Sequence, residues 1–424
     1  MSSSTVINCP IHGFITLSPR MLSIVDTPEF KRLHNLRQLG VAYIVYPSAN
    51  HTRFEHSLGV AHLAKLLIKN LQTNQPELCI NNNQVELVQI AGLIHDLGHG
   101  PFSHLWDEYM LENDDDEHEE RGIKIFKTMV QKYTLPFTSQ EVNQIVEMVN
   151  PSEAKKLNFL YQIVANKMCG IDVDKIDYLQ RDSYHVGFGV NNKFERLITM
   201  CRVVEYNGHQ VLGWPMKLQN EILNLFNLRY RLHKQVYNHH SVKAAEYLVY
   251  SMLLEIKQNR TSEDLYNMYG WNDSIINIPL SDNHKKCLNS LYMRRLPKML
   301  GEQIISVNDN SSISSIENQL SIVLKWLEEN NVDHFNWSKI KIGFVSGNNE
   351  NPLYSVVYYD KEKVGNTLTG FTIREYDSFM VPKNYQEYIY RIFIDSNKNN
   401  DHEMDAAKKT WFAIMGGHKL NQVL

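Results

Sequence analysis

Cysteine is scarce in this chain, which has 5 cysteines among 424 residues. The number is odd, the positions are dispersed, and none of them forms the C-x-x-C pair that zinc ribbons and redox motifs use. A disulfide framework needs an even set of cysteines in a short secreted chain. The sequence therefore argues against disulfide-stapled and zinc-ribbon proteins and favours a reducing compartment.

Long apolar runs and a strong net charge are also missing. No stretch of about 18 uncharged apolar residues predicts a transmembrane helix, and Met1–Thr5 lacks the charged start and apolar segment of a signal peptide. The formal net charge of -4 does not indicate a general polyanion binder, although a local basic patch could bind nucleotide phosphates or a single-stranded nucleic acid. We expect no membrane partner and an intracellular protein, in the cytoplasm or the nucleus.

The first half of the chain has mostly helical spacing of apolar residues, from about Asp26 to Met252. Leu58–Leu71 and Val85–Leu93 are so apolar that we expect both to be buried helices. Later in the chain the pattern changes. Ser306–Asn318 is rich in serine and asparagine, which indicates a surface connection.

The C-terminal part is expected to contain short strands separated by Gly, Asn, Asp and Pro. The predicted strands are Ile340–Val345, Leu353–Tyr359, Phe371–Tyr376 and Tyr388–Ile394. A last helix is expected around Met404–Met415. The sequence thus predicts a mainly α fold, with a helical core at residues 1–280 and a smaller α+β lobe at residues 281–424 that serves regulation or assembly.

The densest group of titratable side chains follows the second apolar helix, from His95 to His104. His95 and Asp96 are adjacent at the helix end, where Gly98 allows a sharp turn, so both could bind one cation. His56 and Asp174 are further candidate ligands. Imidazoles and carboxylates without thiolates suit Fe, Mn, Ni or Zn, with Mg or Mn beside the substrate. The alternative is that His95 and Asp96 are ordinary polar residues that cap a helix.

Two predicted helices carry stripes of polar, titratable side chains at helical spacing. The first stripe is Asp174, Tyr178, Asp182 and His185. The second, on a helix that starts near Asn220, is Arg229, His233, Tyr237 and His240. Together they indicate that both helices line one internal cleft. Each stripe alone could also be a solvated surface.

The order H...HD...D is typical of the HD phosphohydrolase superfamily. Longer segments resemble one family within it, the sterile-alpha-motif and HD-domain deoxynucleoside triphosphate triphosphohydrolases of animals. The segments that carry this resemblance are Pro10–Gly13, Asp26–Pro28, Leu36–Gly40, Arg53–Val60, Ala91–His104 and Gly170–Asp182. Because the similarity begins close to Met1, we expect no sterile alpha motif module. The HD-domain helical core is the fold that the resemblance implies.

The resemblance also implies roles for individual residues. The metal ligands would be His56, His95, Asp96 and Asp174. The catalytic histidines and aspartate would be His99, His104, Asp107 and His118. The triphosphate would be held by Arg53, Lys175 and Arg229. Gln38, Tyr178 and Asp182 would surround the deoxyribose, and a wall of Leu39 and Tyr237 would leave little space for a 2'-hydroxyl.

The reaction implied by the family yields a deoxynucleoside and tripolyphosphate. A metal lowers the pKa of its bound water from about 15.7 toward 7, so we expect hydroxide to attack the α-phosphorus. A histidine with a pKa near neutrality can protonate the leaving 5'-oxygen, a gain of about 100-fold to 10,000-fold. We expect His104 to do so, oriented by Asp107, while His99 and His118 stabilise charge on the phosphate.

Regulation by nucleotides in an allosteric homo-oligomer, a dimer or tetramer, is a further implication of the resemblance. The positions that match regulatory nucleotide sites are Asn8, Asp26, Val45, Arg196, Lys217, Arg294 and Lys298. The chain departs from the family's guanine-binding pattern at Thr5, Lys31 and His34, and Pro215 stands where an arginine is expected. We therefore expect that GTP is not a uniquely required activator.

Two other functions remain open at this point. An HD phosphodiesterase or nucleotidase acting on other nucleotides would use the same metal ligands, although Arg53, Lys175 and Arg229 favour a triphosphate. A non-catalytic nucleotide or nucleic-acid sensor would keep the fold, but it has no chemical need for His104 and Asp107 together. Product analysis with deoxynucleoside triphosphates separates these functions.

Overall fold

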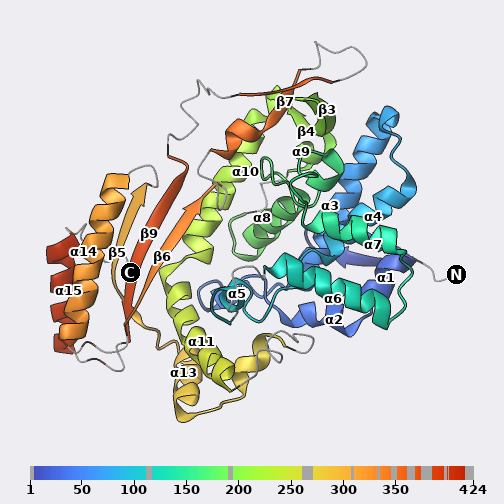
Figure 1. The fold of residues 1–424 in the computed structure, drawn as a ribbon. Helices are drawn as coiled ribbons and strands as arrows, with labels where there is room; N and C mark the ends of the chain where they lie inside the picture. The colour runs from blue at the N-terminus through green and yellow to red at the C-terminus, as the bar shows by residue number, and fades with distance from the viewer. Residues whose placement is uncertain are drawn as a thin grey trace.

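The protein is mainly helical in the computed structural model, with a smaller lobe around a sheet at one end (Figure 1). The structure describes residues 4–110, 117–189, 194–259, 271–306, 310–330, 332, 335–344, 351–360, 368–373, 384–395, 399 and 401–415. The predicted fold class is confirmed. Within these ranges, none of the helices is both long and apolar enough to cross a membrane.

Two helices at the centre of the larger part confirm the two predicted buried helices. They are α3 (Arg53–Asn74) and α4 (Asn82–Ile94), and they pack against each other. Gly92 allows the close approach, because a Cβ atom there would lie 3.2 Å from the Cα of Ala61. The start of α3 at Arg53 puts His56 in the first turns of the helix.

A third helix, α8 (Val173–His185), packs against α3. Asp172 caps α8, since its side chain accepts a hydrogen bond from the backbone N–H of Lys175. The cap fixes the first turn of α8, and Asp174 lies in that turn. The predicted helical stripe that begins at Asp174 therefore falls on a real helix.

The second predicted stripe is only partly correct. α10 (Gln219–Leu232) packs on α8 and continues as a π-helical turn at His233–Tyr237. The chain then leaves the helix at Asn238, and α11 (His240–Gln258) begins as a separate helix. The prediction that His240 shares one helical face with the stripe is wrong, because the π turn and the break change the direction of its side chain.

Shorter helices surround this centre. They are α1 (Pro19–Val25), α2 (Pro28–Lys31), α5 (His104–Met110), α6 (His118–Lys132), α7 (Ser139–Val149), α9 (Glu195–Thr199) and α13 (Asp282–Tyr292). Short 3-10 helices lie at Arg32–Asn35, Ala42–Ile44, Pro76–Leu78, Phe159–Gln162, Met216–Leu218, Asp273–Asn277 and Pro352–Ser355.

Two antiparallel hairpins accompany the helices and were not anticipated from the helical spacing. β1 (Thr5–Cys9) pairs with β2 (Gly13–Leu17) at the N-terminal end. β3 (Arg202–Tyr206) pairs with β4 (His209–Pro215) through a two-residue turn, Asn207–Gly208. Both turn residues have positive φ, 50° and 76°, as a type I' hairpin turn requires.

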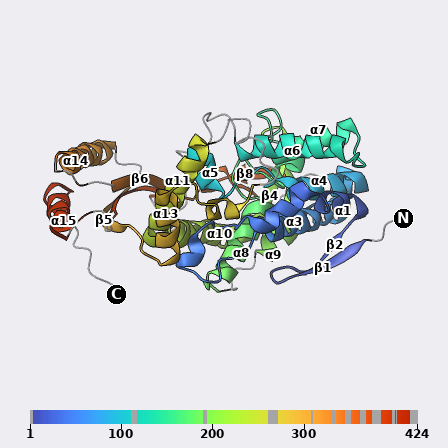
Figure 2. The same cartoon turned by 90° about the horizontal axis from the view of Figure 1, so that it is seen from below.

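The C-terminal lobe contains a three-stranded antiparallel sheet in the order β5-β9-β6. The strands are β5 (Lys298–Ser306), β6 (Phe335–Gly343) and β9 (Gln386–Ile394). α14 (Asn310–Glu329) and α15 (Asp401–Met415) cover the sheet, at the end of the molecule away from β1 and β2 (Figure 2). The predicted last helix and the predicted strand near residue 390 are confirmed.

The prediction of a surface connection at Ser306–Asn318 is wrong, because most of this segment lies in α14. Its serines and asparagines are polar positions of a helix whose apolar residues recur at helical spacing. The buried positions are Ile316, Leu320, Val323 and Leu327. Of the other predicted strand ends, Val345 and Tyr376 lie outside the described residues.

The chain returns from the lobe to the core between β6 and β9. β7 (Val357–Tyr359) pairs in parallel with β4 and antiparallel with β8 (Gly370–Thr372). Phe344, Leu353 and other side chains of this stretch belong to the main hydrophobic core. The division at residues 280 and 281 stays a prediction, and this part of the second half contacts the first closely.

Candidate active site

Four polar side chains from three helix ends meet at the centre of the molecule. His56 comes from α3, His95 and Asp96 directly follow α4, and Asp174 comes from α8. His56 Nε2 lies 3.0 Å from Asp174 Oδ1 and 3.2 Å from His95 Nε2. Asp96 carboxylate oxygens lie 3.6 Å from His56 Nε2 and 3.4 Å from His95 Nε2. The four proposed metal ligands are therefore brought together.

The separations among His56, His95 and Asp174 fit a single bound cation, and Asp96 lies beside this group. Ligand atoms bound at about 2.1 Å and at right angles to one another lie about 3 Å apart. His56 Nδ1 donates to Asp177 Oδ2 at 2.7 Å, and His95 Nδ1 donates to the carbonyl oxygen of Gly92 at 2.8 Å. With Nδ1 occupied on both rings, each presents Nε2 to the cluster, as metal-binding histidines usually do.

The electrostatics of this cluster also favour a cation. Burial lowers the pKa of His56, but its hydrogen bonds to Asp174 and Asp177 outweigh this and raise the pKa to about 10. Burial raises the pKa of Asp174, but its hydrogen bonds to His56 and His95 and their charge hold this pKa below its usual value. Buried carboxylates in such a group need positive charge nearby. The donor set, the spacing and the charge all fit a divalent metal ion.

A second group of histidines lies beside the proposed metal ligands. Its pKa values are shifted in the opposite direction to that of His56. His99 Nε2 is 3.2 Å from Asp96 Oδ1, and the His99 ring stacks on His118 with centroids 3.9 Å apart. His104 meets His99 edge to face at 5.2 Å. Asp107 forms an ion pair with Arg121, and its Oδ2 lies 3.7 Å from His99 Nδ1.

The expected near-neutral pKa of His104 is not found. Part of the His104 side chain reaches solvent, but desolvation by the surrounding protein and the charge of Arg53 lower its pKa to about 4. Burial lowers the pKa of His118 to about 3. In the protein alone, both imidazoles are therefore neutral at pH 7.

The groups expected around the sugar are joined by short hydrogen bonds. Tyr237 Oη donates to Asp182 Oδ2 at 2.5 Å, and His51 Nε2 donates to Asp182 Oδ1 at 2.7 Å. Gln38 Oε1 is buried and has no hydrogen-bond partner among the described residues. An orphaned buried acceptor of this kind calls for a donor from outside the chain. Leu39 packs at the junction of two apolar clusters.

The three proposed triphosphate cations have different surroundings. Arg53 is buried, pairs with Asp96 and donates to Ser103 Oγ at 2.9 Å. Lys175 Nζ lies 3.9 Å from Asp172 Oδ1. Arg229 is buried and donates to the carbonyl oxygen of Gly343 at the end of β6. Tyr178 lies near the last two, since burial raises its pKa while Arg229 and Lys175 act against that rise.

The residues proposed for regulatory nucleotides lie on separate elements and are mostly exposed. Val45 is half-buried, and the exposed members are Asn8, Asp26, Arg196, Lys217, Arg294 and Lys298. Two of them already form ion pairs, Asp26 with Lys31 at 3.1 Å and Arg196 with Glu221. Their role in binding regulatory nucleotides stays a prediction.

Several structural partners of the site were missed by sequence reasoning. Asp177 accepts a hydrogen bond from the proposed metal ligand His56, and the other three, which contact Asp177 or Asp182, are His12, His51 and Arg181. Asp177 has a sequence signal, because it follows Asp174 by three residues within Gly170–Asp182, a segment that carries the family resemblance. His12 lies in the Pro10–Gly13 segment that carries the family resemblance, but its contact with Asp177, 165 positions away, could not be predicted from it. His51 has no such signal, and its partner is also more than a hundred residues away.

Comparison with known proteins agrees with this geometry. Residues 53–182 match the HD domain family, and this range contains the four proposed ligands. The chain is 31% identical to the deoxynucleoside triphosphate triphosphohydrolase SAMHD1 homolog of Dictyostelium discoideum, over 99% of this chain and 82% of that protein. The chain belongs to this triphosphohydrolase family.

Other members of the SAMHD1 family support the assignment. The zebrafish (Danio rerio) SAMHD1 is 30% identical over 95% of this chain and 72% of that protein. The human SAMHD1 is 39% identical over 260 residues, which are 55% of this chain and 42% of the human protein. As a member of the family, the protein is an HD-domain hydrolase.

Proposed function

We propose that this protein hydrolyses deoxynucleoside triphosphates to a deoxynucleoside and tripolyphosphate. The observation that carries the proposal is the convergence of His56, His95 and Asp174 at separations of 3.0 to 3.4 Å, with Asp96 carboxylate oxygens 3.4 and 3.6 Å from the two imidazoles. The SAMHD1 relatives are named for hydrolysis of deoxynucleoside triphosphates, which supports the substrate class. Free cysteines on the described chain are compatible with the intracellular compartment that we propose.

The four converging residues would hold a divalent ion such as Fe, Mn, Ni or Zn, with Mg or Mn accompanying the substrate phosphates. Such an ion acts as a Lewis acid and lowers the pKa of bound water toward about 7. The protein's part is to fix the ligands: Asp177 and the Gly92 carbonyl keep both Nδ1 atoms occupied. Arg53 holds Asp96 from the other side.

The second histidine group would receive the phosphates. His99 and His118 are uncharged at neutral pH, because burial lowers the pKa of each. Neutral rings beside Arg53 can donate N–H groups to phosphate oxygens without the cost of burying more positive charge. Arg53, Lys175 and Arg229 would supply the charge that balances the triphosphate.

His104 would hand a proton to the 5'-oxygen as the bond between that oxygen and the α-phosphorus breaks. A water oxygen forms the new bond to phosphorus, and its proton leaves to solvent. In the free protein the pKa of His104 is about 4. A bound triphosphate brings about four negative charges close to the ring, which raises this pKa toward neutrality. Asp107 would hold the neighbouring rings in place through His99.

Sugar selection would rest on a neighbouring group. Asp182, fixed by Tyr237 and His51, and Gln38, with its unpaired Oε1, would bind the 3'-hydroxyl. Tyr178 would pack on the deoxyribose, and Leu39 with Tyr237 would crowd a 2'-hydroxyl. Buried polar contacts of this kind discriminate more strongly than an apolar wall.

The decisive experiment is product analysis after incubation with dATP, dGTP, dCTP or dTTP and Mn or Mg. Tripolyphosphate and a deoxynucleoside are expected. Pyrophosphate with a monophosphate, or inorganic phosphate alone, would contradict the proposal and favour another phosphohydrolase reaction. Binding without any product would favour a sensor.

Regulation is proposed to require assembly, because the matching residues are mostly exposed and lie on separate elements, so that copies of the chain could bring them together around a nucleotide. Deoxynucleotides bound there would favour a homo-oligomer. Thr5, Lys31 and His34 lack most of the family's guanine-binding groups, so GTP should not be uniquely required. Solution mass and dCTP hydrolysis, each measured with and without GTP, test this. A strict GTP requirement coupled to tetramer formation would contradict it.

A further inference from the structure

Asp177 accepts a hydrogen bond from the proposed metal ligand His56 and connects that residue to His12 and Arg181. Its side chain is fully buried on α8. Oδ2 accepts from His56 Nδ1 at 2.7 Å and from Arg181 Nε at 2.8 Å. Oδ1 accepts from Arg181 Nη2 at 2.9 Å and from His12 Nε2 at 2.5 Å. All donors therefore come from three side chains, only one of which lies on α8 itself.

The space for this carboxylate is kept free by Gly59 on the facing helix α3. A Cβ atom on Gly59 would lie 1.9 Å from Asp177 Oδ1, so any larger residue would displace the carboxylate. The close packing leaves Asp177 few ways to turn. Its orientation is then decided by the donors that hold Oδ1, namely His12 and Arg181.

His12 belongs to the turn between β1 and β2, within the Pro10–Gly13 motif that the proposed reaction does not use. Gly13 completes the turn with a φ of 71°, a conformation that favours glycine. The turn carries the His12 ring inward, so that its side chain is only 7% exposed. A residue 165 positions away from Asp177 in the sequence thus contacts it directly.

We propose that His12 is a positioning residue for the metal centre: through Asp177 it fixes the ring of His56 so that Nε2 faces the metal. The inference rests on the proposed metal centre. A carboxylate that orients a metal-binding histidine is an established kind of outer-sphere support. Here the carboxylate is itself oriented, by a residue of the N-terminal hairpin. Loss of His12 should leave Arg181 as the only donor to Oδ1, so that Asp177 is held less firmly and orients the His56 ring less well.

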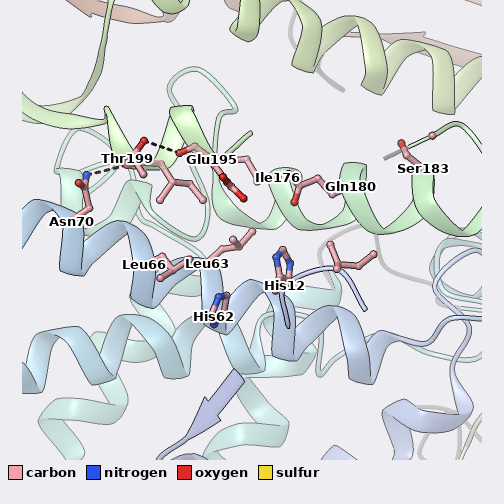
Figure 3. Close-up of a pocket in the computed structure, with 13 residues that line it drawn as sticks. His12, His62, Leu63, Leu66, Asn70, Ile176, Gln180, Ser183, Glu195 and Thr199 are labelled. Carbon is pink, nitrogen blue, oxygen red and sulfur yellow. Dashed lines mark hydrogen bonds between the residues drawn. The ribbon is translucent and has the colours of Figure 1, made fainter. Parts of the chain in front are cut away.

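A cavity beside His12 leaves space for a substituted side chain at position 12, so the proposal can be tested by mutation. The cavity has a volume of about 260 Å³ and is lined by His12, His62, Ile176 and Gln180 among others (Figure 3). The last two lie on the side of α8 roughly opposite Asp174, by helical spacing. His62 stacks on His12 with ring centroids 5.6 Å apart.

His62 is the matched control. It lines the same cavity and contacts the same ring as His12. None of the hydrogen bonds found among the described residues joins it to Asp177. His62→Phe should therefore reproduce any general effect of replacing an imidazole at this place, without touching the support of His56.

The experiment measures Mn²⁺ affinity by calorimetry, and metal content after dialysis, in full-length wild type, His12→Phe, His12→Gln and His62→Phe. His12→Phe removes the donor but keeps a ring, and should weaken Mn²⁺ binding by roughly 10-fold, the lower end of the about 10- to 100-fold loss typical of outer-sphere partners. His12→Gln places an amide N–H near the lost Nε2 and should recover most of the affinity. His62→Phe should bind Mn²⁺ like wild type.

The possible outcomes distinguish the role of His12 from the existence of the metal centre. Equal Mn²⁺ affinity in His12→Phe and His62→Phe would overturn the role of His12 and leave the metal centre intact. A wild-type protein that binds no divalent metal would overturn the metal centre itself. If His12→Phe does not fold by circular dichroism, His12→Ala and His62→Ala replace the pair, and equal affinities there overturn the proposal in the same way.

Discussion

The two histidine groups of the site lie side by side but have opposite electrostatics. His56 and His95 face Asp174, and despite burial the pKa of each is raised. Desolvation, together with the charge of Arg53, lowers the pKa of His99 and of His104. The same side chain thus becomes a partner for cations or for anions according to its neighbours. Phosphate hydrolysis with a metal needs both surfaces within one cleft.

The largest effect should come from breaking the cation-binding group. Asp96→Ala should abolish metal binding and reduce deoxynucleoside triphosphate hydrolysis by at least about 1000-fold, or about 4 kcal/mol of barrier. The substitution also frees Arg53, so folding is checked by circular dichroism. Metal content by mass spectrometry and product release give the answer. Full activity in a metal-free variant would refute the assignment of this group.

His104→Gln should distinguish the role of the second histidine group from that of the metal-binding group. Because His104 is proposed to protonate the leaving oxygen and not to bind metal, hydrolysis should fall by about 100-fold or more while metal content stays at the wild-type level. Single-turnover rates and metal analysis are measured on the same preparation. A loss of bound metal in this variant would show that the two groups do not act separately. An unchanged hydrolysis rate would show that another residue protonates the leaving oxygen.

A smaller effect is expected at the sugar, beside the anion-binding group. Leu39→Ala should enlarge the space for a 2'-hydroxyl and raise the rate with ATP relative to dATP by about 10-fold. The ratio of the two kcat/KM values is the readout, since a general loss of stability lowers both values together. An unchanged ratio would remove Leu39 from the selection of deoxyribose.

The smallest effect concerns acid stability. The pKa of His118 is about 3 in the folded protein and near 6.5 when unfolded. Its contribution to stability is therefore fully present above pH 6.5 and is lost as the pH falls toward 3. His118→Gln should reduce the decline of the unfolding free energy over this range, measured by urea denaturation without metal. Exposed His209→Gln is the control, and identical slopes in both variants would count against the lowered pKa.

Residue types and spacing were sufficient to predict the helices that carry His56, His95 and Asp174, because strong apolar periodicity fixes buried helices. The π turn after α10 was beyond such reasoning, since the spacing of Arg229, His233 and Tyr237 continues a regular helix on paper. The Asn207–Gly208 dipeptide is a hairpin signal that is present in the sequence, but the prediction of a helical first half did not take it into account.

The chemistry was harder to predict than the helices. A pKa depends on neighbours in space, and Arg53 and His104 are far enough apart in sequence that their interaction could not be inferred. The same holds for His12, whose partner on α8 is brought to it by the N-terminal turn. The serine and asparagine residues of α14 led to the wrong prediction of a surface connection, because these residues are tolerated on the exposed side of a packed helix.

The strand order of the C-terminal sheet has a consequence for synthesis of the chain. β9 is the central strand, yet it is made after both of its neighbours, β5 and β6. During translation the two earlier strands have no sheet partner until residue 394 has left the ribosome. Sheet closure must therefore wait for the synthesis of β9, and the edges of β5 and β6 are open to other chains in the meantime. A stalled or truncated product ending before β9 should be a favoured target for chaperones.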